Sequence, residues 1–329
     1  MSSAEGSSVQ PPARVVEWAL QRQQHRRSGD YAAADALRDR IAGAGWTVAD
    51  TPSGPELAPA PAFAAIDPSA IPDRRGEPDT VDVSVLLLLE GHGVEPVPQW
   101  VLADAQRAAT SVLRHTSSRT SFEMVILDDG VGGEAGAWAA DMARNPGARA
   151  FHLAEPVGFA RARLLQQRAA TGSILLWLDT GIELTGDALS RARTIMEDEA
   201  VGAAGGWGGT LTGSVHFFEA AEPAGDVRDV DAVWGYLLAL RRRALVDHGI
   251  APDDGFSFYR NIDADISFQL RAAGWRTVVA DMPAVQHVHR GYSHTPSDVL
   301  ERASRQTYRR LLERWRPQMQ ALVDQRVGH

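Results

Sequence analysis

Four apolar segments that alternate with helical patterns constrain this chain more than any other feature. They span residues 83–89, 122–127, 148–153 and 173–178. Continuous apolar runs are typical of strands buried on both faces, and their alternation with helices predicts a parallel sheet with right-handed crossovers. We therefore expect an α/β fold with a Rossmann-like, mostly parallel central sheet and flanking helices.

Acidic residues stand where three of these strands end. Glu90 follows the first segment, Asp128 and Asp129 follow the second, and Asp179 follows the fourth. Ligands of parallel α/β sheets bind beyond the carboxyl ends of the strands, so these carboxylates are candidate site residues. The structural alternative is that they only shape the turns that follow, as Asp-Asp-Gly sequences often do.

Two further groups of polar residues lie nearer the C-terminus. Asp263 and Asp265 precede a helical pattern at 266–272. The helix dipole stabilises carboxylates in the first helical turn, which is the structural interpretation. A carboxylate that faces a cleft can instead act as a base. His287 and His289 alternate along an extended segment and therefore face the same side, which suggests a metal or phosphate site.

Composition excludes several classes of chemistry. The chain of 329 residues has no cysteine, and its 33 basic residues are all arginine. This excludes disulfides, cysteine-ligated zinc, thiol catalysis, Schiff bases and a P-loop lysine. The net charge of −9 argues against DNA or RNA as a partner. No apolar run approaches the roughly 20 residues of a membrane span, and the N-terminus lacks a signal-peptide core, so we expect a cytoplasmic protein.

The composition changes along the chain predict five parts. We expect a disordered tail (1–13), a helical hairpin module (14–57), a Pro/Ala-rich linker (58–79), the α/β domain (80–295) and a C-terminal amphipathic helix (296–329). The last helix has an apolar stripe beside many arginines. Packing of this stripe on a second subunit, giving a homodimer, and peripheral contact of the helix with an anionic membrane both stay open.

The order and spacing of these motifs resemble family 2 glycosyltransferases, which have the GT-A fold, over about residues 81–293. The matching segments are the first strand, Leu127-Asp128-Asp129-Gly130-Val131, Pro156-Val157-Gly158 with Ala162-Arg163, Leu178-Asp179, and Ile262-Asp263-Ala264-Asp265 followed by Gly274 and His287. The resemblance implies transfer of a sugar from a nucleotide-sugar donor to an acceptor, with inversion and with help from a divalent cation, Mg²⁺ or Mn²⁺. Such a cation stabilises the charge that develops on the leaving diphosphate.

The resemblance also assigns roles to residues. Asp263 would be the catalytic base, with Asp265 in the same motif. The nucleotide would be bound by Glu90, Asp128, Asp129, Gly158, Arg163 and Asp179, and the metal by Asp179, His287 and His289. Gly181 stands where the family has its second metal-binding aspartate. The alternative is therefore a GT-A domain that has lost catalysis and binds a nucleotide or a partner.

Residues 14–57 have a resemblance of their own. The segment Ala34-Asp35-x-Leu37-Arg38-Asp39 and, further on, Asp50-Thr51-Pro52-Ser53-Gly54 resemble the small C-terminal module of cysteinyl-tRNA synthetases. The ATP-site motifs and zinc ligands of a synthetase do not occur in the chain, so we expect no aminoacylation. Contact with RNA and docking of another protein both stay open for this module, although the net charge argues against RNA.

Overall fold

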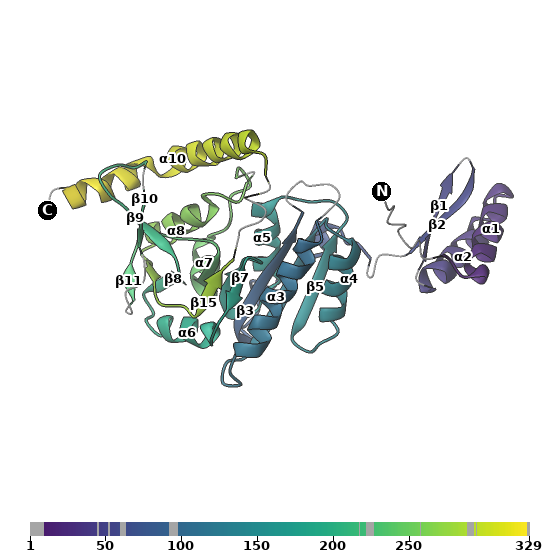
Figure 1. Cartoon of the computed structure of the whole chain (residues 1–329), viewed down its shortest axis with the longest axis horizontal. Coiled ribbons are helices and arrows are strands. Elements are labelled where there is room, and N and C mark those ends of the chain that lie inside the picture. Colours follow the sequence, from purple (N-terminus) through teal and green to yellow (C-terminus); the bar gives the residue numbers. More distant parts are fainter. Residues whose placement is uncertain are drawn as a thin grey trace, which may run out of the picture. The chain divides into compact units, whose positions relative to one another are not determined.

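The structure is a computed structural model that describes residues 10–44, 46–51, 53–59, 64–91, 98–216, 218–221, 227–256, 258–287, 293 and 295–327. The chain divides into two compact units, residues 1–64 and 65–329, and each is described by itself (Figure 1). Most of the expected tail at 1–13 lies outside the described residues, and its last residue, Ala13, already begins a helix.

The N-terminal unit contains the two helices expected there and a β hairpin that was not expected. Helices α1 (Ala13–Arg27) and α2 (Tyr31–Gly43) are followed by strands β1 (Trp46–Thr51) and β2 (Gly54–Pro59), which pair antiparallel. Its small core consists of Val15, Ala19, Ile41 and Trp46. A bond of 2.8 Å from Arg22 Nη1 to Asp50 Oδ1 ties α1 to β1. The expected linker therefore starts too early, because β2 takes its first residues.

An eight-stranded sheet forms the centre of the larger unit. Its order is β11-β14-β8-β13-β6-β3-β4-β5. The neighbours β5-β4-β3-β6 and the pair β8-β14 run parallel, whereas β13 and β11 are antiparallel to their neighbours. The α/β class and the mostly parallel sheet are thus confirmed. The strands are β3 (Val81–Glu90), β4 (Phe122–Asp129), β5 (Ala148–Leu153), β6 (Gly172–Leu178), β8 (Val201–Gly205), β11 (Arg228–Asp229), β13 (Leu237–Arg241) and β14 (Arg276–Val279).

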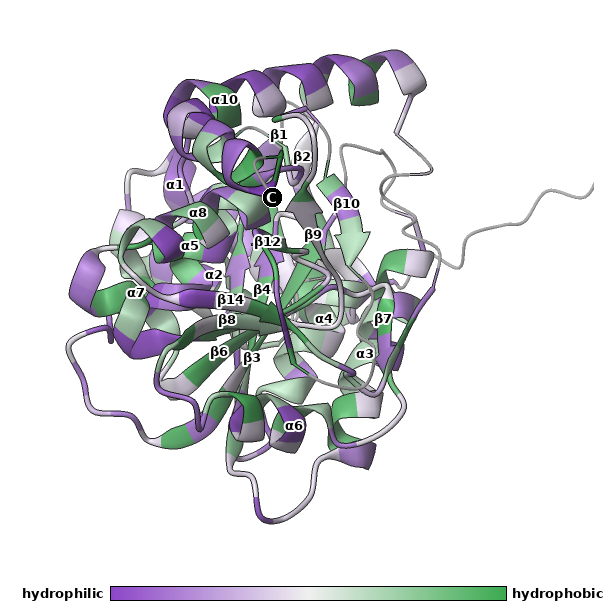
Figure 2. Ribbon diagram, turned by 90° about the vertical axis from the view of Figure 1, so that its left-hand side faces the viewer, coloured by the Kyte–Doolittle hydropathy of each residue, from purple (hydrophilic) through white to green (hydrophobic). Residues whose placement is uncertain are grey.

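Helices cover this sheet, and its strands form the green, apolar centre of Figure 2. The helices are α3 (Trp100–His115), α4 (Gly133–Met142), α5 (Phe159–Ala169), α6 (Ala188–Ile195), α7 (Arg242–His248), α8 (Ile262–Ala272) and α10 (Ser297–Val327). Two small sheets lie beside the large one. One places β9 (Gly208–Leu211) between β10 (Phe218–Ala221) and β12 (Ala232–Val233), and the other pairs β7 (Ile182–Leu184) with β15 (Ala284–Gln286).

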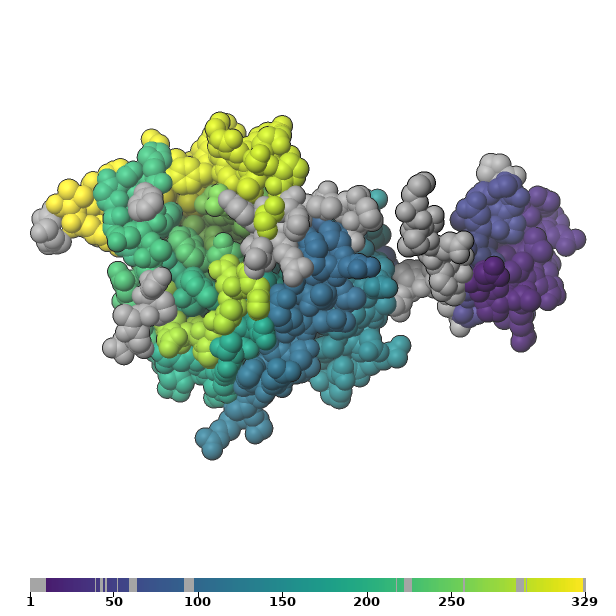
Figure 3. Space-filling model, in the orientation of Figure 1, coloured from purple at the N-terminus to yellow at the C-terminus, as the bar shows by residue number. Residues whose placement is uncertain are grey.

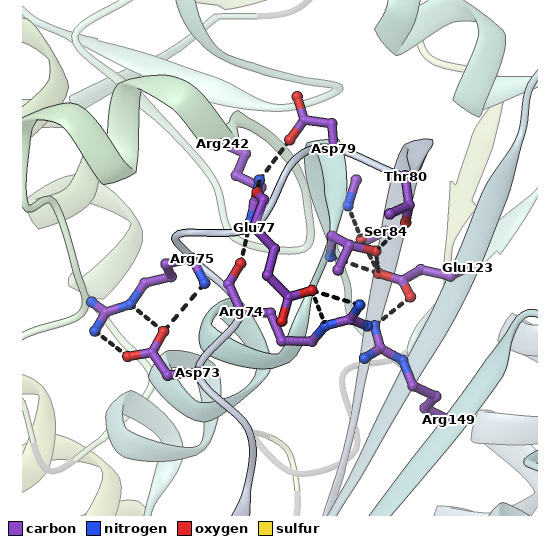
Figure 4. Close-up of polar contacts among 12 residues, drawn as sticks. Asp73, Arg74, Arg75, Glu77, Asp79, Thr80, Ser84, Glu123, Arg149 and Arg242 are labelled. Atoms are coloured by element: carbon purple, nitrogen blue, oxygen red, sulfur yellow. Dashed lines mark hydrogen bonds and ion pairs between the residues drawn. The ribbon is translucent and has the colours of Figure 1, made fainter.

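Much of the segment expected to be a linker belongs to the larger unit. Ile66 bridges to Leu153, and Ile71 is 1% exposed in the core. Arg242 holds the chain just before β3 by donating to the carbonyl oxygens of Arg74 and Glu77 and, at 2.6 Å, to Asp79 Oδ1 (Figure 4). Composition alone predicted a spacer, but these contacts pack the segment against the larger unit. Ile66 lies beside the end of β5, and residues 74–79 are held at the edge of the sheet where β3 begins.

A buried carboxylate strengthens the same edge of the sheet. Glu123 on β4 accepts hydrogen bonds from Ser84 Oγ at 2.6 Å and from the Thr171 backbone N–H at 2.7 Å, and it forms an ion pair with Arg149 (Figure 4). Burial opposes the charge, but these partners hold the pKa of Glu123 below its usual value. This network joins β3, β4, β5 and β6 at the edge opposite their carboxyl ends.

The C-terminal helix packs its apolar face on its own unit. Leu311, Met319 and Val323 are buried, and Trp315 stacks on Phe268 of α8 with ring centroids 5.9 Å apart. In Figure 3 the helix, coloured yellow, lies along the top of the larger unit. The stripe that the sequence offered to a second subunit or a membrane is therefore covered within the chain. Of the helices in the described part of the chain, none is both long and apolar enough to cross a membrane.

Candidate active site

A cavity of about 660 Å³ opens between the sheet and the C-terminal helix. Its walls come from the end of β6, the start of α5, the small sheet around β10, the turn into α8, and the first three turns of α10. Aromatic side chains and a few polar groups share these walls, as is usual for small-molecule sites. The lining includes Phe159, Trp177, Asp179, His216, Phe218, Trp234, Gly235, Tyr236, Tyr259, Arg260, Asn261, Asp263, Ser297, Leu300, Glu301, Ser304, Arg305 and Tyr308.

Asp179 lines this cavity from the carboxyl end of β6. Its backbone N–H donates to the Tyr236 carbonyl oxygen at 2.9 Å, and its Oδ1 accepts from the Gly181 N–H at 2.7 Å. The side chain is only partly exposed. The carboxylate is thus held at the edge where the sequence predicted ligand binding.

Asp263 lines the same cavity from the first turn of α8. Its Oδ2 accepts from the Gly235 N–H at 2.8 Å, and its Oδ1 accepts from the Ala264 N–H at 2.9 Å. Burial raises the pKa of this carboxyl group, although the backbone donors and the charge of Arg260 oppose the shift. A carboxylate with a raised pKa in a cavity wall has the properties of a general base.

Asp265 does not reach the cavity, and the expectation that it serves catalysis is corrected. It is fully buried and accepts from Trp315 Nε1 at 2.7 Å and from Arg314 Nη1 at 3.0 Å, both on α10. Burial raises its pKa, while Trp315 and Arg314 counter the shift. Two residues along a helix amount to about 200° of rotation, so Asp263 and Asp265 point to different sides. Asp265 therefore anchors α10 to α8.

Asn261, one residue before α8, has an unusual backbone conformation. It is the one non-glycine residue with positive φ among the described residues, at φ 69°. Its Nδ2 donates to Thr307 Oγ1 of α10 at 3.1 Å, and its carbonyl oxygen accepts from the Asp265 N–H. Left-handed conformations of this kind are enriched at functional sites. The turn that presents Asp263 is therefore braced by α10.

The paired aspartates after β4 are built into turns. Asp128 is fully enclosed, and it accepts from His152 Nδ1 at 2.7 Å and from the N–H groups of Val131 and Gly132. Asp129 accepts from the N–H groups of Val157 and Gly158 at 2.7 and 3.1 Å, and burial raises its pKa. Neither lines the cavity, and these hydrogen bonds tie their carboxylates to loops beside it. Their contact with a nucleotide stays a prediction.

Glu90 ends β3 with a partly exposed side chain and does not line the cavity, and Gly158 and Arg163 are placed at the start of α5. Gly158 adopts φ 88° and begins α5, so it serves the turn. Arg163 is 1% exposed, donates to the Leu86 carbonyl oxygen at 2.9 Å and lies under the rings of Phe159 and Trp177. Its burial lowers its pKa to about 10, against the opposing charges of Asp179 and Glu90. Arg163 thus packs against two rings of the cavity wall and does not itself line the cavity, and its contact with a nucleotide stays a prediction.

The residues predicted to bind a metal do not form a complete cage. His287 Nε2 forms a hydrogen bond with Glu183 Oε2 at 2.8 Å, and the backbone N–H of His287 donates to the Gly181 carbonyl oxygen. His289 lies outside the described residues. Within the described ranges, no three His or acidic side chains are grouped so that they hold an ion. Of these predicted ligands, Asp179 lines the cavity. Mg²⁺ is commonly bound by one or two carboxylates together with substrate phosphates.

Trp177 in the cavity wall carries a buried donor. Its side chain is fully buried, and its indole Nε1 has no acceptor among the described residues. That nitrogen is itself enclosed, so it does not offer a donor to the cavity.

Sequence reasoning missed the contribution of α10 and of the aromatic walls. The residues of α10 in the lining are spaced three or four apart, and this periodicity marks one helix face. The signal was present in the sequence, because residues 297–308 continue the helix face of the apolar stripe towards the start of the helix, where that face becomes more polar. It was not usable because the position of the helix in the fold was unknown.

Comparisons with known proteins agree with this architecture. The family model described as "Glycosyl transferase family 2" matches residues 103–258. One similar solved structure is the "Crystal structure of GalNAc-T7 with UDP, GalNAc and Mn2+", with a TM-score of 0.57 and 16% identity. The match covers 73% of this chain and 50% of that one, so this chain spans about half of the matched protein. No curated protein matches the chain. The larger unit thus has a GT-A-like α/β fold that contains a glycosyl transferase family 2 match.

Proposed function

We propose that this chain is a glycosyltransferase that moves a sugar from a nucleotide-sugar donor to a hydroxyl group of an acceptor. The observation that carries the proposal is a single cavity that contains Asp179 at the carboxyl edge of the sheet and Asp263, with its raised pKa, in the wall of α8. The family match and the GT-A-like fold support it. The structure of the solved neighbour contains UDP, which is consistent with a nucleotide in such a fold.

The proposed reaction is a single displacement with inversion. Asp263 takes the proton of the acceptor hydroxyl. At the same time, the oxygen of that hydroxyl forms a bond to the anomeric carbon of the donor sugar. The bond from that carbon to the diphosphate breaks, and the electron pair leaves with the nucleoside diphosphate. Gly235 and Ala264 hold the Asp263 carboxylate through their N–H groups, so its orientation is set before the acceptor arrives.

A divalent cation, Mg²⁺ or Mn²⁺, belongs to the proposal. Asp179 would hold it together with the diphosphate of the donor, because Mg²⁺ is commonly bound by one or two carboxylates plus substrate phosphates. When bound, it would supply charge stabilisation for the leaving group. The Mn²⁺ in the solved neighbour supports this choice of cation.

The first test is donor binding measured by thermal stability. The purified chain is heated with a panel of nucleoside diphosphates and nucleotide-sugars, with and without Mn²⁺ or Mg²⁺. A ligand at about 100 times its Kd stabilises by roughly 2.7 kcal/mol, which raises Tm by a few degrees. We expect a cation-dependent rise with one nucleotide. The variant Asp179→Ala should lose it, while Asp141→Ala, at an exposed helical position, should keep it.

The absence of any shift in a folded protein would contradict the proposal. A second candidate function, nucleotide binding without transfer, is favoured by Gly181 where a second metal-binding carboxylate was expected. The two functions are separated by following the donor sugar. A donor that raises Tm but is neither transferred nor hydrolysed would support the non-catalytic domain.

A further inference from the structure

The cavity extends from the edge of the sheet to α10. Phe159, Trp177 and Asp179 lie at the sheet edge, within the matched segment 103–258. Residues 259–263 and α10, which lie beyond that segment, form the wall that carries Asp263, and Tyr259 meets Phe159 edge to face with centroids 6.3 Å apart. If the donor occupies the sheet edge, as the proposed function requires, the α10 side is the space left for the acceptor.

The wall that carries Asp263 is joined directly to α10. Arg260 Nη1 donates to Ser304 Oγ at 3.2 Å, and Asn261 Nδ2 donates to Thr307 Oγ1 at 3.1 Å. A hydroxyl that gives its proton to Asp263 must lie within hydrogen-bond reach of that carboxylate. Such a hydroxyl is therefore in the part of the cavity that α10 encloses.

Flat aromatic rings enclose this part of the cavity. Phe218 and Trp234 pack edge to face, with centroids 5.6 Å apart, and Tyr259 and Tyr308 complete the lining. The Tyr308 hydroxyl donates to the Val215 carbonyl oxygen at 2.6 Å, which fixes its ring on α10. Fixed rings suit the apolar C–H face of a ring-shaped ligand, with polar groups at its edge.

The charges on this side cancel one another. Glu301 and Arg305 of α10 form an ion pair, and the charge of Arg260 acts on Asp263. The side therefore has two guanidinium groups and two carboxylates. An acceptor with a phosphate or carboxylate group would require a cation that is not already balanced. An uncharged acceptor needs no such cation.

We infer that the α10 face of the cavity is the acceptor subsite, and that the acceptor is an uncharged, ring-shaped compound with several hydroxyl groups, such as a glycoside. This inference rests on the proposed function. Trp234 and Tyr259 offer the stacking surface, Glu301 accepts hydrogen bonds from acceptor hydroxyls at the rim, and Asp263 takes the proton of the reacting hydroxyl.

The test measures binding and does not need transfer. Saturation-transfer difference NMR is recorded on the full chain with methyl glycosides of glucose, galactose and mannose, in the presence of the nucleoside diphosphate that raises Tm most. Glucose 1-phosphate and vesicles that contain a polyisoprenyl phosphate serve as charged probes. We expect at least one methyl glycoside to bind and to compete more strongly than either charged probe.

Two variants locate the subsite. Glu301→Gln should weaken binding of that glycoside about fivefold, as expected for loss of a charge-assisted hydrogen bond near the surface. The matched variant Glu313→Gln, which also breaks an exposed i,i+4 pair on α10 but lies away from the cavity, should leave it unchanged. Trp234→Leu should abolish it. If Trp234→Leu does not fold, the comparison of Glu301→Gln with Glu313→Gln still tests whether the glycoside binds at the α10 face.

The outcomes are distinguishable from failure of the proposed function. If no nucleotide raises Tm, the proposed function fails. If a nucleotide binds but no methyl glycoside does, or if a charged probe binds better, the acceptor inference is overturned. Equal effects of Glu301→Gln and Glu313→Gln would also overturn the assignment to the α10 face.

Discussion

Two pairs of aspartates in this molecule look alike in sequence and behave differently in the fold. Asp128 and Asp129 end β4, and both are buried and accept from N–H groups, those of the loop after β4 for Asp128 and those of the loop after β5 for Asp129. Asp263 and Asp265 begin a helix, and only Asp265 is enclosed, whereas Asp263 lines the cavity. An acidic motif therefore identifies the region of a site, while the partners of each carboxylate identify its role.

The local backbone explains the difference. The turn after β4 brings the N–H groups of Val131 and Gly132 back to Asp128. The loop after β5 brings those of Val157 and Gly158 to Asp129, so both carboxylates already have backbone donors. In a helix, residues two apart point to different sides. One member of the second pair can then face the cavity while the other holds α10. Each prediction below changes one of these carboxylates or its support.

The largest effect is expected for Asp263→Asn. Asparagine keeps the size of the side chain but cannot take a proton, so kcat should fall by about 10²- to 10⁴-fold. Removing the charge of a carboxyl group with a raised pKa relieves a cost at neutral pH, whereas the amide can accept from only one of the Gly235 and Ala264 N–H groups. The two effects oppose each other, so Tm at neutral pH should change little. Donor binding should persist in the thermal-shift assay. Activity within a few-fold of the wild type would remove Asp263 from the proposed mechanism.

The pH profile sharpens the same assignment. Asp263 must be ionised to act as a base, and burial raises its pKa above the usual 3.8. The rate should therefore fall about tenfold per pH unit below that raised pKa. The acid limb of kcat/KM against pH should have its midpoint clearly above 3.8. A profile that stays flat down to pH 4, in protein that remains folded, would contradict a base with a raised pKa.

Asp265→Asn should show the opposite pattern, a loss of stability with donor binding retained. It removes the charge that pairs with Arg314 and weakens the acceptor of the Trp315 indole N–H. Removing one partner of a buried pair is costly, and because Arg314 is partly exposed we expect about 2 kcal/mol. Denaturant unfolding measures this loss. Asp298→Asn, whose partner Arg302 is exposed on the same helix, should change stability by less than about 0.5 kcal/mol.

The contrast between these variants reflects what the sequence could and could not predict. Apolar runs such as 83–89 report burial on both faces, which is a local property, so the central strands and their carboxyl-end acidic residues were predictable. The roles within each pair were not, because they depend on partners such as Trp315 and Arg314, about 50 residues from Asp265. The position of α10 in the fold was not predictable either, because it too depends on contacts between residues far apart in the sequence.

Asp128→Asn should lower stability through a turn and not through a helix contact. The amide can keep only part of the bonding with His152 Nδ1 and the N–H groups of Val131 and Gly132. A buried donor left without its partner costs about 1–3 kcal/mol, and we expect the lower half of this range because one oxygen remains. Thermal unfolding of Asp128→Asn beside Asp263→Asn tests directly whether the two pairs of aspartates differ in role. Equal losses of stability in the two variants would contradict that difference.

The smallest effects concern Asn261, which connects the second pair to α10. Its φ of 69° is adopted by glycine without strain, whereas a residue with a Cβ is disfavoured there. Asn261→Ala should therefore be less stable than Asn261→Gly by about 1 kcal/mol, measured by denaturant unfolding. Both variants lose the bond to Thr307.

If that bond orients the turn before Asp263, both Asn261 variants and Thr307→Val should lower kcat by a similar factor and leave donor binding unchanged. Thr307→Ser, which keeps the Oγ acceptor, should restore kcat. A fall in kcat that instead follows the order of stability would mean that Asn261 serves only the backbone turn. The role of α10 in the site would then be confined to its lining residues, and Asp263 would depend on Gly235 and Ala264 alone for its orientation.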